Sequence, residues 1–409
     1  MGVRTDLPNF YARRPYRATM AAMKLYPILS ALSPHDVVEA PPREGLASQL
    51  EMIHRLVSTR VAVVDRIAVV AHDVQTGLLK TLVSSSHDDG RPPHHEVALA
   101  DVPTLSALAR QRGTRVIHDI ARDFQSSSSH STWLKLHHYQ SSVTTPIYQG
   151  NELAGFLFYD AKQLHAFTDA DVEKLVEFTD LIAHLFLTQR RLARGIVSAI
   201  QVAVDMARSR DFETGQHLER IAYYSRIMAR AMAQSHGLSD EYIEYLELFS
   251  PLHDIGKVGI PDHILLKPGR LDAEEYEIMK RHVPMGESII RRISQDLGLV
   301  GSLQEQVMRN IVATHHERGD GSGYPRGLTM DQIPLEGRIV AVADVYDALS
   351  NRRAYKDSWN DDAVCTELRA EAAKGLLDKT CVEALLAATD ERASIKLRFA
   401  DARVADDYA

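Results

Sequence analysis

The stretch HDIGKVGIPDHILLKPGRL, residues 253–271, decides how this chain is interpreted. It begins with a histidine and an aspartate that directly follow the apolar segment 245–252. Lys257 stands three residues after Asp254, which places both side chains on one face of a helical turn. Around this stretch, from Asp205 onward, the hydrophobic spacing predicts a mostly helical region.

Further histidines and carboxylates recur on apolar helical segments to either side. A single histidine on an apolar helix is more often a hydrogen-bonded core residue, but a buried carboxylate such as Asp344 needs a charged partner or a metal ion. Glu213 and His217, four residues apart, share one face of a helix or of a turn that runs into one. Together these residues predict a multinuclear metal site. Its candidate ligands are Glu213, His217, His253, Asp254, His282, His315, His316 and Asp344.

The chemistry of these side chains narrows the choice of metal and reaction. Imidazole and carboxylate ligands without thiolate disfavour structural zinc and suit divalent iron or manganese. Asp254, at the centre of the set, is the natural bridging ligand between two ions. Closely spaced ions can clamp a phosphodiester and lower the pKa of a water between them. Asp254 and Lys257 are therefore the candidate catalytic residues, with Lys257 offsetting phosphate charge or protonating the leaving group.

A histidine–aspartate pair with a downstream metal-binding aspartate resembles the HD phosphohydrolase superfamily. Together with residues 253–271, the stretches HHERGDGSGYP (315–325) and IPLEGRIVAVADVYDALSNRRAYK (333–356) resemble the HD-GYP subfamily over roughly residues 200–390. The resemblance implies an all-α domain that hydrolyses cyclic di-GMP to pGpG or GMP, with all eight candidate ligands binding metal. The presence of Glu213 and His217 makes three ions plausible in place of two.

The resemblance also implies substrate contacts and supporting residues. The substrate-binding candidates are Lys257, Gly323, Tyr324, Arg353 and Lys356. Tyr324 either stacks on a guanine or hydrogen-bonds a phosphate, or anchors its loop. Arg353 and Lys356 lie one helical turn apart, a spacing that suits joint contact with a phosphate or a guanine edge. Glu317 and Asp347 are expected to hydrogen-bond the ligands, with Glu317 orienting His315 or His316.

Three positions depart from the subfamily pattern. Gly319 replaces a larger and often aromatic residue, Ala354 replaces a frequent proline, and 377–379 reads Leu-Asp-Lys in place of Phe-Asp-Pro. None of the three removes a candidate ligand. We expect that they loosen the substrate loop and alter the rate or the dinucleotide preference.

The region before the metal motifs has a different pattern. Apolar spacing predicts a helix over 46–58, β-branched runs predict two hairpins (66–84 and 142–159), and the serine-rich segment 125–132 predicts a loop. With FTDADVEKLVEFTDLIAHLF (167–186), the second hairpin resembles a GAF domain over 45–190. The GAF resemblance implies an α+β sensor with an antiparallel sheet and an unidentified small ligand. Because the region lacks cysteine, a thioether-linked chromophore is excluded.

A helical pattern continues from the end of this region into the next one. Residues 170–210 predict a connector helix whose apolar stripe could form a dimerising coiled coil, so that a homodimer is expected. Two shorter helices broken at Gly195 are the alternative. The fold class expected is thus multidomain, a GAF-like sensor joined by a long helix to an all-α catalytic domain.

Composition limits the remaining possibilities. The 409 residues suit two or three domains, with a leader over 1–44 and a C-terminal tail over 391–409. Two cysteines fit a reducing cytoplasm, and no apolar run is long enough to cross a membrane. A net charge of -8 gives no reason to bind long nucleic acid.

The sequence therefore predicts a cytoplasmic, sensor-regulated cyclic di-GMP phosphodiesterase. Two rival hypotheses stay open. One is a receiver that binds the dinucleotide, hardly turns it over and signals to protein partners through the Gly-Tyr-Pro loop. The other is a phosphodiesterase for the mixed cyclic GMP-AMP, since the sequence does not resolve guanine from adenine at one of the two base sites.

Overall fold

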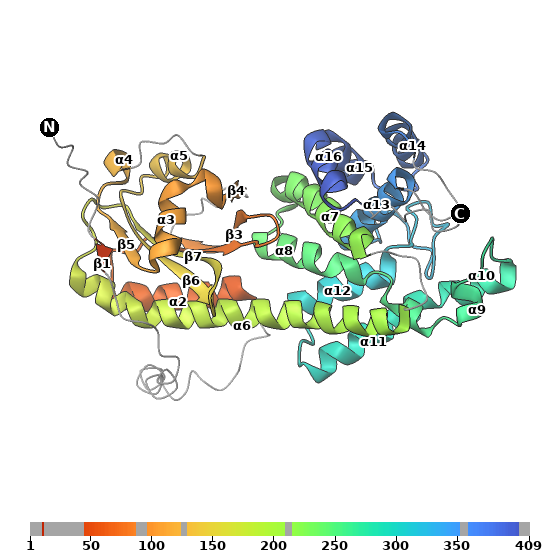
Figure 1. Cartoon of the computed structure of the whole chain (residues 1–409), viewed down its shortest axis with the longest axis horizontal. Coiled ribbons are helices and arrows are strands. Elements are labelled where there is room, and N and C mark those ends of the chain that lie inside the picture. The colour runs from red at the N-terminus through yellow and green to blue at the C-terminus, as the bar shows by residue number, and fades with distance from the viewer. Residues whose placement is uncertain are drawn as a thin grey trace, which may run out of the picture. The chain divides into compact units, whose positions relative to one another are not determined.

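The computed structural model describes residues 10–11, 45–86, 96–123, 129–208, 215–351 and 359–400. The chain divides into two compact units, Met1–Gln189 and Arg190–Ala409, each with its own hydrophobic core. Figure 1 labels their helices and strands. The first unit is α+β and the second is helical, which confirms the predicted fold class. No helix within the described ranges has the length and the apolar content that a bilayer crossing requires.

The first unit contains, in its described residues, a seven-stranded antiparallel sheet of order β1-β5-β6-β7-β2-β3-β4. The strands are β1 (Phe10–Tyr11), β2 (Arg66–His72), β3 (Leu78–Ser86), β4 (Glu96–Ala98), β5 (Thr114–Ile117), β6 (Ser141–Gln149) and β7 (Glu152–Ala161). The helices are α2 (Leu46–Arg60), η2 (Leu99–Asp101), α3 (Pro103–Gln111), α4 (Ile120–Asp123), α5 (Ser129–Leu136) and the start of α6 (Asp169–Arg208).

Both predicted hairpins form, and local chemistry explains their turns. In the β2–β3 turn, Asp73 Oδ1 accepts hydrogen bonds from the backbone N–H groups of Gln75 and Thr76. Gly77 then takes a positive φ of 70°, which costs a glycine little. Gly150 does the same in the β6–β7 turn, at φ 62°.

The sheet is buried on both faces, which explains its near-continuous apolar strands. Along β2, Ile67 and Val69 pack with α2 and α6, whereas Ala68 and Val70 pack with α3 on the opposite face. This alternation follows from the period of two along a strand.

The segment predicted as a loop, 125–132, is helical from Ser129 onward in α5. That part of the prediction is wrong, because the packing of Trp133 and Leu134 into a small core cluster overrides the low helix preference of the serines.

Helix α6 is continuous from Asp169 to Arg208, so the alternative of two helices broken at Gly195 is wrong. Thr168 caps its start by accepting from the N–H of Asp171. Part of the apolar stripe of α6 is buried within the chain: Phe178 and Phe186 lie in the core of the first unit, and Ile196 lies in that of the second. Other apolar residues of the helix, such as Val176 and Val202, are exposed, and the homodimer stays a prediction.

Helices are the regular secondary structure of the second unit within its described residues, joined by turns and loops. They are α7 (Gly215–His236), α8 (Asp240–Phe249), η3 (Ser250–Leu252), η4 (Ile255–Gly259), α9 (Asp262–Leu265), α10 (Ala273–Lys280), α11 (His282–Asp296), α12 (Leu303–Thr314), α13 (Leu335–Ser350), α14 (Asp361–Ala373), α15 (Lys379–Ala387) and α16 (Thr389–Arg398).

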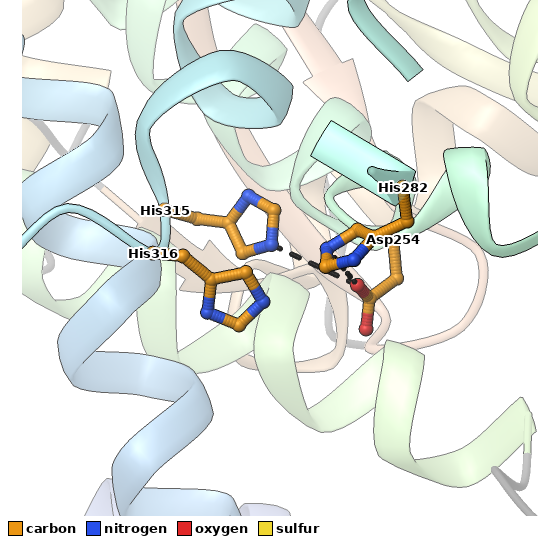
Figure 2. Close-up of side chains that lie close together, drawn as sticks. All are labelled: Asp254, His282, His315 and His316. Carbon is orange, nitrogen blue, oxygen red and sulfur yellow. Dashed lines mark ion pairs between the residues drawn. The ribbon is translucent and has the colours of Figure 1, made fainter. Parts of the chain in front are cut away.

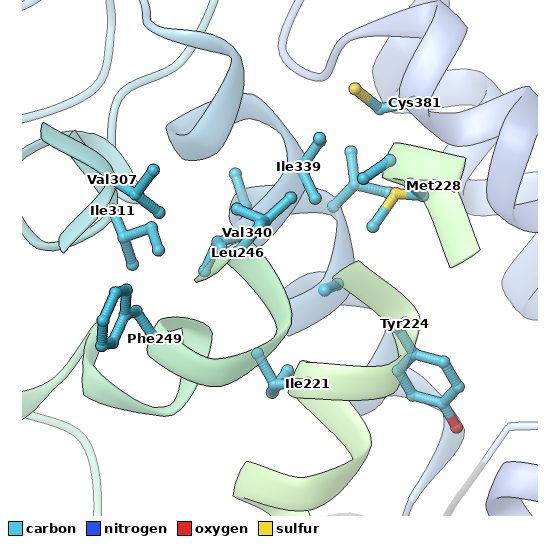
Figure 3. Packing of buried hydrophobic residues seen from close by; sticks show 14 of the residues in the cluster. Ile221, Tyr224, Met228, Leu246, Phe249, Val307, Ile311, Ile339, Val340 and Cys381 are labelled. Atoms are coloured by element: carbon cyan, nitrogen blue, oxygen red, sulfur yellow. The ribbon is translucent and has the colours of Figure 1, made fainter. Parts of the chain in front are cut away.

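The core of this unit is formed where α7, α8, α12 and α13 meet. Figure 3 shows Met228 of α7, Phe249 of α8, Ile311 of α12 and Val340 of α13 among its closely packed side chains. All four are fully buried, and such packing makes the four helices a rigid frame for polar residues at their ends.

Three glycines bring backbone segments of this unit into direct contact. A Cβ on Gly256 of η4 would lie 1.8 Å from the carbonyl oxygen of His282 on α11. A Cβ on Gly286 of α11 would lie 2.6 Å from Val312 of α12, and one on Gly337 of α13 would lie 2.0 Å from Oγ1 of Thr314. Because these positions have no side chain, η4, α11, α12 and α13 can pack in direct contact with one another.

The predicted boundary between the catalytic domain and a C-terminal tail at residue 391 cuts through α16. Arg392 of α16 is buried at 3% exposure, so α16 belongs to the packed unit, at least as far as Phe399. The physical reason is the contact of α16 with α7 and α15, which the many charged residues of this helix concealed in the sequence.

We predict that Gly256→Ala destabilises the second unit by roughly 2–3 kcal/mol, because the new methyl group meets backbone that cannot move aside. Urea unfolding followed through the fluorescence of Trp359, in a Trp133→Phe background, measures this. Gly195→Ala is the matched control: nothing lies within 4 Å of its added Cβ, and it should be neutral or stabilise α6 by up to about 1 kcal/mol. Equal midpoints for both variants would contradict the prediction.

Candidate metal centre

The candidate ligands come from the ends and inner faces of five segments. His217 lies in the first turns of α7, and the His253–Asp254 pair occupies the junction between η3 and η4. His282 begins α11, and His315 and His316 follow the last residue of α12. Asp344 projects from the middle of α13. The glycine contacts described above hold these segments close enough for the side chains to meet.

The structure brings seven of the eight candidates together in two groups. Within each group, one ligand atom per residue lies within 4.8 Å of all the others. The first group is Asp254, His282, His315 and His316, shown in Figure 2. The second group is His217, His253 and Asp344. The eighth candidate, Glu213, lies outside the described residues.

The carboxylate of Asp254 stands between the two groups. Its Oδ1 lies 3.2 Å from Nε2 of His282 and 3.7 Å from Nε2 of His315, as the dashed lines in Figure 2 show. Its Oδ2 lies 3.2 Å from Nε2 of His253 and 2.8 Å from Nζ of Lys257. One oxygen thus faces each group, which is the arrangement a bridging carboxylate needs.

The histidines are oriented through their Nδ1 atoms. A hydrogen-bond partner at Nδ1 fixes the ring and turns Nε2 toward the centre of the group. Three of the partners are backbone carbonyl oxygens: Ser250 for His253 (2.9 Å), Met279 for His282 (2.7 Å) and Ile311 for His315 (3.1 Å). His217 instead faces a carboxylate, with Nδ1 2.7 Å from Oδ2 of Asp347.

The buried charges of this site shift several pKa values. Burial by itself would raise the pKa of Asp254, but Lys257, His253 and His282 outweigh it and hold that pKa well below its usual range. Burial lowers the pKa of His315, and burial together with His315 lowers that of His316 well below its ordinary value. At neutral pH the site therefore holds an ionised carboxylate beside two neutral imidazoles, the protonation states that bind metal ions.

These residues fit divalent metal ions. Among the described residues, Nε2 of His282, Nε2 of His315 and Oδ1 of Asp254 are buried atoms without a well-aligned hydrogen bond, although they lie close to one another. Leaving such atoms unsatisfied is costly, and an ion among them would remove that cost. The donors are nitrogen and oxygen without sulfur, a set that suits iron or manganese.

The Gly-Tyr-Pro loop lies against the first group. The ring of Tyr324 stacks on His316 with centroids 4.7 Å apart, and its backbone N–H donates to the carbonyl oxygen of His316 at 3.2 Å. A Cβ on Gly323 would lie 2.2 Å from the backbone nitrogen of Arg318. The glycine thus permits the loop to approach the chain just after the histidines, rather than serving an unusual turn.

Glu317 has a different role from the expected one. It was predicted to orient His315 or His316, but its carboxylate accepts from the backbone N–H groups of Arg326 (2.8 Å) and Leu328 (2.9 Å). The prediction is wrong because the carboxylate of Glu317 points toward residues 326–328, the later part of the same loop, and not back along α12. It holds the loop closed behind Tyr324.

Gly319 is a tight packing position, and the expectation that it loosens the loop is wrong. An added Cβ would lie 2.1 Å from Met330 and 2.5 Å from the carbonyl oxygen of Gly375. The backbone of Gly319 also bonds Leu376 and Met330. The loop is therefore anchored where the larger residue of the subfamily pattern would not fit.

Asp347 lies where a supporting residue would act, and it reveals a partner that the sequence analysis missed. Besides His217, its carboxylate is held by Nε of Arg220 at 2.6 Å and by Nδ2 of Asn351 at 2.8 Å. The position of Arg220, three residues after His217 on one helical face, was the available signal. Two substrate candidates, Arg353 and Lys356, and the departure at Ala354 lie outside the described residues.

Comparison with known families agrees with this division of the chain. Residues 45–185 match the family model of the GAF domain, and residues 201–381 match that of the HD domain. The chain therefore carries a GAF domain followed by an HD domain, as predicted, whereas the HD-GYP subfamily and the domain boundaries stay predictions. All seven described candidate ligands lie within the HD match.

Curated relatives match about half of the chain. The chain is 42% identical over 225 residues to a Vibrio cholerae serotype O1 protein named 3′3′-cGAMP-specific phosphodiesterase 2, covering 55% of this chain and 40% of the relative. It is 45% identical over 177 residues to the cyclic di-GMP phosphodiesterase response regulator RpfG of Xanthomonas campestris pv. campestris (43% and 44%). It is 41% identical over 191 residues to a cyclic di-GMP phosphodiesterase of Thermotoga maritima (47% and 49%). The chain thus spans less than half the length of each of these relatives.

The lowered pKa values predict how the metal-free protein responds to acid. An unfolded histidine takes up a proton near pH 6.5, whereas His315 and His316 resist protonation in the folded state. The unfolded state therefore binds more protons as the pH falls below about 6.5, and folding stability declines. His316→Gln should make this decline shallower in thermal unfolding between pH 7.5 and 5.5 with a chelator present. Substitution of the exposed His263 by Gln should leave the decline unchanged, and a similar slope for both variants would refute the assignment.

Proposed function

We propose that the HD domain is a metal-dependent phosphodiesterase of the HD-GYP type that hydrolyses cyclic di-GMP to pGpG, GMP or both. The observation that carries this proposal is the Asp254 carboxylate, with one oxygen facing each of two groups of imidazole and carboxylate ligands. The names of the relatives supply the substrate class, since each is a phosphodiesterase for a cyclic dinucleotide.

Each group would hold at least one divalent ion. His282, His315 and His316 would bind one ion, His217, His253 and Asp344 another, and Asp254 would bridge them. Glu213, together with His217, would bind a third ion. The number of ions, two or three, therefore depends on a residue that lies outside the described residues. Bound ions would polarise the phosphoryl oxygens and lower the pKa of a water molecule.

The chain's own residues would supply the rest of the chemistry. The ammonium of Lys257 lies 2.8 Å from Oδ2 of Asp254, where it would offset charge on a phosphate or donate a proton to the leaving oxygen. Tyr324 covers His316 on one side, and its position supports a contact with substrate there as well as a role in anchoring the loop. Arg353 and Lys356 stay proposed phosphate or guanine contacts.

The GAF domain would regulate this activity in response to a small ligand, acting in the cytoplasm. Helix α6 supports the proposal, because its residues contribute to the cores of both units and a change in the helix would reach each core. A proline in place of Gly195 would interrupt the helix. Unchanged phosphodiesterase activity of the folded Gly195→Pro chain would contradict a signalling role for α6.

Hydrolysis of cyclic GMP-AMP is a second candidate function, favoured by the 42% identity to a relative named as a phosphodiesterase specific for 3′3′-cGAMP. A receiver that binds the dinucleotide without hydrolysis is the third. Both share the proposed site, so activity on matched substrates decides among the three.

The test is anaerobic incubation of the iron- or manganese-loaded chain with cyclic di-GMP and 3′3′-cGAMP, separately and in competition, with products followed by chromatography. We expect faster hydrolysis of cyclic di-GMP and none by His253→Ala/Asp254→Ala. A higher kcat/KM for 3′3′-cGAMP would transfer the assignment to that substrate. Binding without turnover under either metal would establish the receiver instead.

We also predict that Lys257→Met lowers kcat by about 100-fold or more with little change in metal content, since the ammonium acts on charge that develops in the reaction. Lys280→Met is the control: Lys280 is a half-buried lysine paired with Glu277, and its ammonium lies over the ring of Tyr324 rather than at Asp254. It should change KM at most. A wild-type kcat for Lys257→Met would remove Lys257 from the proposed chemistry.

A further inference from the structure

We infer that Arg220 and the C-terminal helix α16 together position the metal ligand His217. Helix α16, Thr389–Arg398, lies beyond residue 381, where the match to the HD domain ends. A segment outside the matched domain thus contributes to the geometry of the metal centre. The inference rests on the proposed metal ligation, but not on the identity of the substrate.

The first link runs from Arg220 to His217 through Asp347. Arg220 is buried at 2% exposure on α7, one turn after His217. Its Nε donates to Oδ1 of Asp347 at 2.6 Å, and its Nη2 donates to Oδ2 at 3.0 Å. A planar guanidinium that holds both oxygens fixes the plane of the carboxylate. Since Oδ2 also meets Nδ1 of His217 at 2.7 Å, this fork determines where Nε2 of His217 points.

The second link runs from Arg220 to the end of α16. Its remaining terminal nitrogen, Nη1, donates to the carbonyl oxygen of Phe399 at 2.7 Å. Phe399 is the residue directly after the last residue of α16. At a helix C-terminus the carbonyl oxygens lack hydrogen-bond partners within the helix and carry partial negative charge. The ring of Phe399 stacks on Tyr223 of α7, with centroids 5.1 Å apart and planes 19° from parallel. The guanidinium thus lies between a carboxylate and a helix C-terminus that is itself seated on α7.

A third contact holds α16 against the helix that carries Asp347. Nη1 of Arg392, a buried residue of α16, donates to the hydroxyl of Tyr346 at 3.0 Å and to Oδ1 of Asp361 at 2.8 Å. Tyr346 directly precedes Asp347 on α13. Helix α16 is therefore tied both to α7, which carries His217, and to α13, which carries Asp344; Figure 1 labels the three helices.

Helix α7 offers a matched control for a purely structural role. Arg226 is also buried, at 7% exposure, and its Nη1 pairs with Glu247 of α8. This pair joins α7 to α8 and includes no candidate ligand. Arg226→Met therefore removes a buried guanidinium from the same helix without altering the support of His217.

The experiment is Co²⁺ titration of the metal-free 409-residue chain, followed by visible absorption and calorimetry. In Arg220→Met we expect a loss of about 10- to 100-fold in affinity for one class of sites, the His217 group, and wild-type affinity for the other class. Arg220→Lys retains the charge but not the fork, and it should show the same selective loss. Arg226→Met should bind both classes as the wild type does.

Phe399→Ala tests the link to α16 and decides the question if Arg220→Met does not fold. It should weaken the His217 class by about tenfold. Wild-type affinity of both classes in a folded Arg220→Met chain, or in Phe399→Ala, would overturn the inference, as would an equal loss in Arg226→Met. A wild-type chain that binds no Co²⁺, Mn²⁺ or Fe²⁺ would instead refute the proposed metal ligation.

Discussion

The contact of η4 with α11 is the constraint on which the metal centre depends. Because Gly256 has no side chain, the segment that carries Asp254 reaches the backbone at the start of α11, where His282 lies. Gly286 then permits α11 to approach α12, whose end carries His315 and His316. Any side chain at these positions would push apart the segments that carry the ligands. The arrangement of the imidazoles is thus a consequence of backbone packing.

Electrostatics imposes the second requirement, since a buried carboxylate must be compensated. Asp254 meets this requirement with Lys257 on one oxygen and imidazoles around both. The Nδ1 atoms of the surrounding histidines are engaged by carbonyl oxygens or by Asp347, which leaves the Nε2 atoms directed inward. These hydrogen bonds fix the rings from outside the two groups, which would lower the ordering cost of binding an ion.

Several expectations from the sequence failed where a residue's role depends on distant partners. Glu317 closes the loop behind Tyr324 instead of orienting a histidine, because it meets backbone N–H groups 9 and 11 residues further on. The serine-rich segment became helix α5 because Trp133 and Leu134 are buried.

By itself the sequence determined the two-domain organisation, both hairpins and the identity of the candidate ligands. These features depend on local spacing and on residue chemistry, which a sequence states directly. Only the tertiary structure decided that the candidate ligands form two groups with Asp254 between them, that Gly319 tightens its loop, and that α16 reaches Asp347 through Arg220. Those contacts join residues as many as 179 positions apart, and their geometry is set by how the helices pack, which no local pattern encodes.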